Sequence, residues 1–115
     1  MEVPFVSIIV LNYNGQDFIR ECLESIKKIK YDKDRYEVIV VDNASTDKSV
    51  GVIKTYEPWI KFIEAGSNLG YAGGNNVGVK AAKGKYLVIL NPDTVVDENF
   101  LKELVDAIEH NKDVG

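Results

Sequence analysis

Polar residues gather in four short clusters along the chain, each directly after an apolar segment. The clusters contain Asn12, Tyr13 and Asn14; Asp42, Asn43 and Asp47; Asn68 and Gly70; and Asn91, Asp93 and Thr94. Amides and carboxylates can hydrogen-bond a base or a ribose, and a lone carboxylate can hold a divalent ion whose other ligands are phosphates and water. The clusters are therefore candidate ligand contacts.

The first two clusters also have structural interpretations. Turn formation and helix capping explain residues 12–14 more simply than ligand contact when the cluster is taken alone. Tyr13 can stack on a flat base or pack against a sheet edge. For Asp42 we favour ligand contact. Ser45 or Thr46 can cap the next helix, so the Asp42 carboxylate is not needed as its cap and has less of a structural role. Asp47 is expected to complement a helix dipole.

The third cluster opens a segment rich in glycine, with Gly70, Gly73, Gly74 and Gly78. Close packing of a helix on the sheet and close approach of a ligand to the backbone explain these glycines equally well. The pattern is not the G-x-G-x-x-G fingerprint and does not follow the first strand, so Rossmann-type dinucleotide binding is disfavoured.

The fourth cluster presents a carboxylate after a proline. Pro92 fixes the turn directly after an apolar strand and places Asp93 at its end, where a divalent ion could bind. A turn-forming aspartate is the alternative. No Ser/His/Asp, Cys/His or zinc constellation is present, so no catalytic residue is predicted. Cys22 lies at helical spacing among apolar residues and is expected to be a buried core thiol.

The elements that position these clusters alternate between strand and helix. Apolar, β-branched runs predict strands at 5–11, 36–41, 59–65 and 86–90, buried on both faces. Helices are expected over 19–29 with Asn14 or Asp17 as cap, up to 57 before Pro58, over 71–83 with Gly84 at C′, and from Asp97. This order predicts an α/β fold with a mainly parallel sheet between helices, and ligands at the carboxyl ends of its strands.

Length, composition and charge limit the number of domains and the kinds of partner. The chain has 115 residues, 45% of them hydrophobic, which predicts a single domain over residues 1–115. A net charge of −4 without a clustered basic face argues against nucleic acid as partner. The apolar stretch 5–11 is too short to span a bilayer, so we expect a cytoplasmic domain without a transmembrane segment. Peripheral association of a longer protein with a membrane stays open.

Four motifs in order resemble family 2 glycosyltransferases of the GT-A fold. They are VSIIVLNYN at 6–14, VDNASTD at 41–47, NLGYAGGNNVG at 68–78 and NPD at 91–93. The resemblance implies a three-layer α/β/α architecture and a donor that is a nucleotide-diphosphate sugar, UDP- or dTDP-linked. It further implies inverting, metal-dependent transfer to a carbohydrate or lipid-linked acceptor, in polysaccharide biosynthesis.

The same resemblance assigns roles to individual residues. Tyr13 and Asp42 would contact the base or ribose, residues 70–76 would line the diphosphate, and Asp93 would bind Mg²⁺ or Mn²⁺. The predicted nucleotide-binding set is Asn12, Tyr13, Asn14, Asp42, Asn68, Gly70, Gly73, Asn75 and Asn91.

The chain departs from the family pattern at three points. Asn91 stands at the first place of the usual Asp-x-Asp motif, as in the rhamnosyltransferase-like branch, and Asn75 stands where many relatives have arginine. The chain also stops before an acceptor-binding half, so we expect the donor-binding half alone, inactive without the catalytic base. A non-catalytic sugar-nucleotide-binding module is the alternative. A phosphoacceptor domain and a nucleotidyltransferase fit poorly, because the residues each requires after the first strand are absent.

Overall fold

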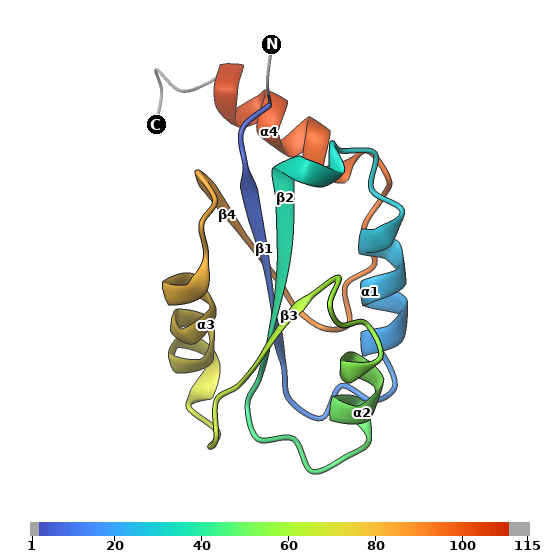
Figure 1. Cartoon of the computed structure of the whole chain (residues 1–115), viewed down its shortest axis with the longest axis vertical. Helices are drawn as coiled ribbons and strands as arrows, with labels where there is room; N and C mark the ends of the chain where they lie inside the picture. Colours follow the sequence, from blue (N-terminus) through green and yellow to red (C-terminus); the bar gives the residue numbers. More distant parts are fainter. Residues whose placement is uncertain (1–2, 111–115) are drawn as a thin grey trace.

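The computed structural model describes residues 3–110 and has three layers, helix, sheet and helix (Figure 1). The elements are β1 (Val6–Asn12), α1 (Ile19–Lys27), η1 (Lys33–Arg35), β2 (Tyr36–Asp42), α2 (Ser49–Lys54), β3 (Lys61–Glu64), α3 (Gly70–Ala81), β4 (Tyr86–Leu90) and α4 (Phe100–His110). The strands are parallel in the order β3-β2-β1-β4. The expected α/β/α fold is confirmed, although residues 1–2 and 111–115 of the predicted domain lie outside the described residues.

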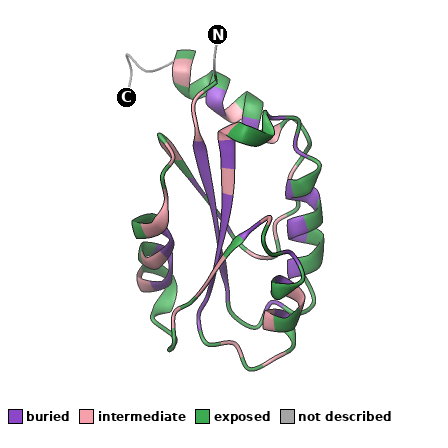
Figure 2. Ribbon diagram, viewed as in Figure 1, coloured by how far each residue is buried: buried purple, intermediate pink, exposed green. Residues whose placement is uncertain are grey.

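The two central strands, β1 and β2, form the interior of the sheet (Figure 2). All seven residues of β1 are buried, because neighbouring strands cover its edges and helices cover both of its faces. The register runs from Val6 opposite Tyr36 to Asn12 opposite Asp42. The polar residues that end both strands therefore lie side by side at the carboxyl edge.

The two faces of the sheet pack against different helices. Alternation along the strands directs Val6, Ile8 and Val10 toward the larger core, to which α1, α2 and α4 contribute. Ile9 and Leu11 point the other way, into a smaller core covered by α3. Burial of each of these side chains stabilises the fold by about 1.5–3 kcal/mol.

Two glycines of α3 allow the helix to lie directly on the sheet. A Cβ on Gly74 would lie 2.5 Å from Leu11 Cδ1, and one on Gly78 would lie 2.6 Å from Ile9 Cγ2. Close packing therefore explains these two glycines. Gly70, the first residue of α3, has a φ of +76°, a left-handed conformation that favours glycine.

The edge strands are more exposed than the sequence predicts. β3 spans only Lys61–Glu64 and has no fully buried residue. In β4, Leu87 and Ile89 are 43% and 42% exposed. The apolar run of β4 predicted burial on both faces, but α3 covers β1 and β2 and leaves the same face of β4 open.

The predicted caps of the first two helices are wrong. The residue before α1 is Phe18, which makes no side-chain cap, and the amides of Phe18 and Ile19 bond to the carbonyl of Gly15 instead. The residue before α2 is Lys48, also without a side-chain cap. That helix ends at Lys54, before Pro58, because the following amides turn back to carbonyls three residues earlier.

The predicted cap of α3 is wrong for a different reason. The helix ends at Ala81, and Ala82 is already extended, with a ψ of 142°. Gly84 instead approaches β1, where its amide donates to Ser7 Oγ at 2.8 Å and an added Cβ would lie 2.5 Å from the Ser7 nitrogen. The glycine marks a close approach of two backbone segments.

The last helix, α4, begins at Phe100, and the Asp97 carboxylate accepts the Asn99 backbone amide before it. Among the described helices, none has the length and apolarity needed to cross a membrane.

Candidate functional site

Hydrogen bonds join the carboxyl ends of β1 and β2. The Asn12 side chain is fully buried, and its Nδ2 donates to Asp42 Oδ1 at 2.9 Å, to Ser49 Oγ at 2.9 Å and to Ser45 Oγ at 3.2 Å. Its Oδ1 is buried without a hydrogen-bond partner among the described residues. Asn12 therefore ties the first strand to the loop after the second.

The Asp42 carboxylate organises this loop. It is 2% exposed and accepts hydrogen bonds from the Ser45 backbone amide at 2.9 Å and from the Ser45 hydroxyl at 2.6 Å. It also accepts the bond from Asn12 Nδ2. The expectation that this carboxylate has little structural work is wrong, because a buried charge is tolerated only when hydrogen bonds replace its hydration. Its contact with a ligand stays a prediction.

Asn14 joins the loops after β1 and β2 at the surface. Its side-chain Oδ1 accepts the Thr46 backbone amide at 2.8 Å, and its backbone amide donates to Ser45 Oγ at 2.9 Å. The backbone φ of Asn14 is 50°, a left-handed conformation that asparagine tolerates better than most residues. These contacts give Asn14 a structural role in the loop, as the turn interpretation predicts.

Asp47 lies just before α2 and also bridges the two loops. Its carboxylate accepts the amides of Ser49 at 2.9 Å and Gln16 at 3.0 Å. Burial raises the pKa of Asp47, but the hydrogen bonds from Ser49 and Gln16 outweigh it, and the net pKa is lowered. The carboxylate thus stays ionised at the start of the helix.

Asn43 belongs to the second polar cluster but is not in the predicted nucleotide-binding set, although it lines the hollow at this edge. It is 3% exposed, its Nδ2 donates to the Gly70 carbonyl at 3.0 Å, and its Oδ1 accepts the Leu69 amide at 3.1 Å. These bonds fix the start of α3 to the end of β2. The position of Asn43 directly after β2 was the available signal. The sequence prediction instead selected the neighbouring Asp42, because Asp42 is charged.

A hollow of about 360 Å³ opens at this carboxyl edge, and we call it the carboxyl-edge hollow. It is lined by Leu11, Tyr13, Asn43, Asn68, Gly70, Tyr71, Asn91 and Pro92. Tyr13 and Tyr71 are 50% and 63% exposed, so both rings are free to meet a ligand. Residues from all four predicted clusters thus meet at one hollow, as expected for an open α/β sheet.

The remaining predicted residues lie outside the lining. Asn12 and Asp42 are buried, and an added Cβ on Gly73 would meet Leu69 Cβ at 2.9 Å. Asn75 is 4% exposed, with neither side-chain polar atom paired within the described chain. Asp93 is exposed, two residues beyond Asn91.

The described residues offer a divalent metal one carboxylate rather than a cage. No group of three or more His, Cys, Asp or Glu side chains converges within residues 3–110. Asp93 follows Pro92, a residue of the lining, and its exposed carboxylate is the type of single oxygen ligand that suits Mg²⁺ or Mn²⁺ bound mainly through phosphates and water; metal binding by Asp93 stays a prediction. Burial, and secondarily the charge of Asp93, raises the pKa of the Cys22 thiol to about 11. The predicted buried core thiol is confirmed, and its raised pKa keeps Cys22 protonated at neutral pH.

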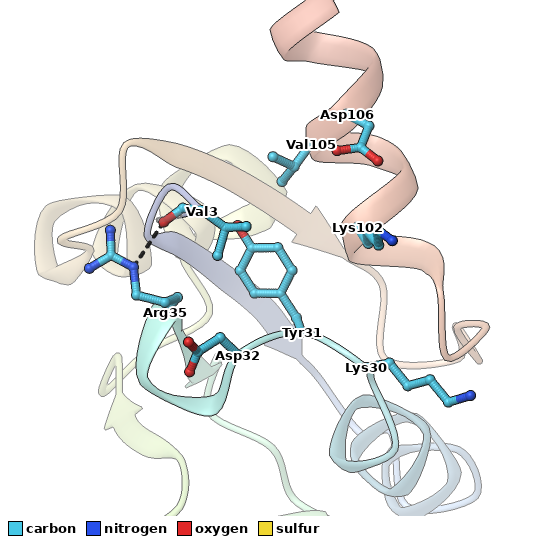
Figure 3. A pocket seen from close by; sticks show the side chains of 8 residues that line it. All are labelled: Val3, Lys30, Tyr31, Asp32, Arg35, Lys102, Val105 and Asp106. Carbon is cyan, nitrogen blue, oxygen red and sulfur yellow. Dashed lines mark hydrogen bonds between the residues drawn. The ribbon is translucent and has the colours of Figure 1, made fainter. Parts of the chain in front are cut away.

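A second hollow, of about 400 Å³, lies near the amino ends of β1 and β2 (Figure 3). Its wall combines cations and carboxylates, including Arg35, Lys102, Asp32 and Asp106. Arg35 Nε already donates to the Val3 carbonyl at 2.9 Å. Parallel sheets bind ligands at the opposite, carboxyl edge, so the carboxyl-edge hollow is the stronger candidate.

Comparison with known proteins identifies the family of the chain. The family model described as glycosyl transferase family 2 matches residues 7–115. The chain belongs to this family. Two similar curated proteins are the poly(ribitol-phosphate) beta-N-acetylglucosaminyltransferase TarS of Staphylococcus aureus and the uncharacterized glycosyltransferase MJ1057 of Methanocaldococcus jannaschii. TarS is 33% identical over 94% of this chain and 20% of its own length. MJ1057 is 33% identical over 99% of this chain and 40% of its own length.

Solved structures confirm the GT-A fold. The complex of S. aureus TarS 1-349 with UDP-GlcNAc superposes with a TM-score of 0.85 at 30% identity, covering 94% of this chain and 32% of that one. The mannosyltransferase PcManGT of Pyrobaculum calidifontis, in complex with GDP-Man and Mn²⁺, gives 0.83 at 28% identity, covering 96% and 33%. The chain thus spans about a third of either structure. Its place in the rhamnosyltransferase-like branch stays a prediction.

Proposed function

We propose that this chain forms the donor-binding part of a glycosyltransferase that transfers a sugar from a nucleotide-diphosphate sugar to an acceptor hydroxyl. The observation that carries the proposal is the carboxyl-edge hollow, where the ends of three strands and the start of α3 bring aromatic, amide and backbone groups together. Membership of glycosyltransferase family 2 supports it.

The nucleoside is proposed to lie against Tyr13 or Tyr71. An exposed aromatic ring offers a stacking surface, which typically contributes about 1–3 kcal/mol per base. Asn43 and Asn68 add amide groups to the lining. Asp42 Oδ2 accepts one hydrogen bond, from the Ser45 amide, and a carboxylate oxygen can accept a second one from a base or ribose.

The diphosphate is proposed to lie at the start of α3. Backbone amides and the positive end of this 12-residue helix favour an anion, and Gly70 has no side chain to block it. Asp93 would hold Mg²⁺ or Mn²⁺ against the phosphates, and the ion would offset the charge of the departing diphosphate. The Mn²⁺ in the PcManGT complex supports this part of the proposal.

Inverting transfer also needs a base that deprotonates the acceptor hydroxyl. We assign no described residue to that role, because the lining of the hollow contains no carboxylate or histidine. We propose that the base and the binding site for a carbohydrate or lipid-linked acceptor lie outside residues 1–115. Residues 1–115 alone are then expected to bind nucleotide without transferring sugar.

Calorimetric titration of the chain tests the donor site. UDP, dTDP and GDP are each added with and without Mn²⁺, to the wild type, to Asp93→Ala, and to Asp34→Ala. Asp34 is an exposed carboxylate in η1, at the opposite end of the sheet, so its removal makes the same charge change away from the hollow. The proposal predicts Mn²⁺-dependent binding of one diphosphate, weakened only by Asp93→Ala. Failure of a folded chain to bind any of the three contradicts it.

A further inference from the structure

Asn75 carries a buried side-chain amide that no described residue pairs. Its side chain lies in α3 and is 4% exposed, and neither Nδ2 nor Oδ1 has a hydrogen-bond partner among the described residues. Leaving one buried polar group unpaired costs about 1–3 kcal/mol, and an amide has both a donor and an acceptor to satisfy. A hydrophobic residue would stabilise this position better. The position therefore points to a ligand that supplies the missing partners.

The geometry of α3 places this amide beside the carboxyl-edge hollow. Residues four apart share one side of a helix, so Asn75 lies one turn beyond Tyr71, which lines the hollow. The preceding residue, Gly74, rests on Leu11 and on the Asn43 amide, two further residues of the lining. Asn75 thus lies next to residues of the lining, one helical turn further along α3, without being part of the lining itself.

The chemistry of the amide separates the parts of a nucleotide sugar. Phosphate oxygens only accept hydrogen bonds, so a diphosphate could pair Nδ2 but would leave Oδ1 buried and unpaired. A hydroxyl or acetamido group of a sugar both donates and accepts, and satisfies both ends of the side chain. The backbone amides at the start of α3 already suit the diphosphate without Asn75.

We propose that Asn75 binds a hydroxyl or acetamido group of the donor sugar and helps to select that sugar, rather than binding the diphosphate. This inference rests on the proposed donor site. It makes Asn75 a specificity-determining residue: it contributes to affinity only when the sugar is present.

The test compares affinities for a nucleoside diphosphate and for its sugar conjugates. UDP, dTDP and GDP, and UDP-GlcNAc, UDP-glucose, dTDP-rhamnose and GDP-mannose, are titrated with Mn²⁺ into the wild type, Asn75→Leu, Asn75→Ala and Asn99→Leu. Leucine keeps the approximate shape of asparagine without its polar atoms, and alanine provides a second variant that favours helix. Asn99 is an exposed amide before α4 and serves as the matched control.

Both Asn75 variants are expected to bind the preferred diphosphate within twofold of wild type and its preferred sugar conjugate about tenfold more weakly. Asn75→Leu should unfold at the wild-type temperature or above it, since it removes an unpaired buried amide. An equal loss for diphosphate and conjugate would assign Asn75 to the phosphates and overturn the inference. No loss for either ligand, or no gain in wild-type affinity from any sugar, would overturn it too. A wild type that binds no diphosphate instead refutes the donor site itself.

Discussion

Two glycine-to-alanine substitutions test how closely α3 lies on the sheet. In α3, a Cβ at Gly78 would lie 2.6 Å from Ile9 Cγ2 and 3.2 Å from Val41 Cγ2. In α2, a Cβ at Gly51 would meet no atom within 4 Å. Gly51→Ala is therefore a matched control, in which the same substitution changes helix propensity without changing packing.

The magnitudes follow from these distances. Alanine favours a helix over glycine by about 1 kcal/mol, so Gly51→Ala should stabilise the protein by about 0.5–1 kcal/mol. At Gly78 the same gain opposes an overpacking cost of about 1–3 kcal/mol, because Ile9 is β-branched and lies on a central strand where it cannot turn away. We expect Gly78→Ala to destabilise the fold by about 1–2 kcal/mol.

Urea denaturation followed by circular dichroism measures both effects. The midpoint should rise for Gly51→Ala and fall for Gly78→Ala, with the slope of the unfolding free energy against urea unchanged in both. A Gly78→Ala variant as stable as Gly51→Ala would refute the reasoning, since it would show that α3 does not press on β1 at this register.

Three further predictions concern single side chains. Ser7→Ala should destabilise the protein by about 1–3 kcal/mol in thermal or urea unfolding, because it leaves the Gly84 amide without its Ser7 Oγ partner. Cys22, buried and with its pKa raised to about 11, should not react with a thiol reagent at pH 8 until the protein unfolds, and rapid labelling of the native protein would contradict its burial. Lys30→Ala should change stability by less than about 1 kcal/mol, since its 3.0 Å ion pair with Glu98 is solvent-exposed.

The architecture was predictable because the strong signals are local. The nearly continuous apolar run of 5–11, rich in β-branched residues, and the apolar run of 36–41 are typical of strands buried on both faces, and both are central in the sheet. The alternation of strand and helix then favours parallel strands with helical crossovers. The same rule brought residues such as Tyr13, Asn68 and Asn91, far apart in the chain, to a common hollow.

The details that escaped prediction depend on tertiary partners. Whether the Asp42 carboxylate is free or occupied depends on Asn12, thirty residues away, and Ser45, and sequence spacing carries no such information. Gly84 has the local pattern of a helix cap, yet its position is set by contact with Ser7 on β1. The isolation of the Asn75 amide likewise became visible only once its neighbours in space were known.

The most direct test of the donor site is to map where a nucleotide binds. Backbone ¹H–¹⁵N spectra of the ¹⁵N-labelled chain would be recorded while UDP, dTDP or GDP is added with Mg²⁺, which does not broaden the signals. The proposed function predicts that the largest shift changes cluster at the carboxyl-edge hollow, among Tyr13, Asn43, Gly70, Tyr71 and Asn91. Changes centred instead on Val3, Tyr31, Arg35 and Lys102, in the hollow at the other end of the sheet, would contradict it.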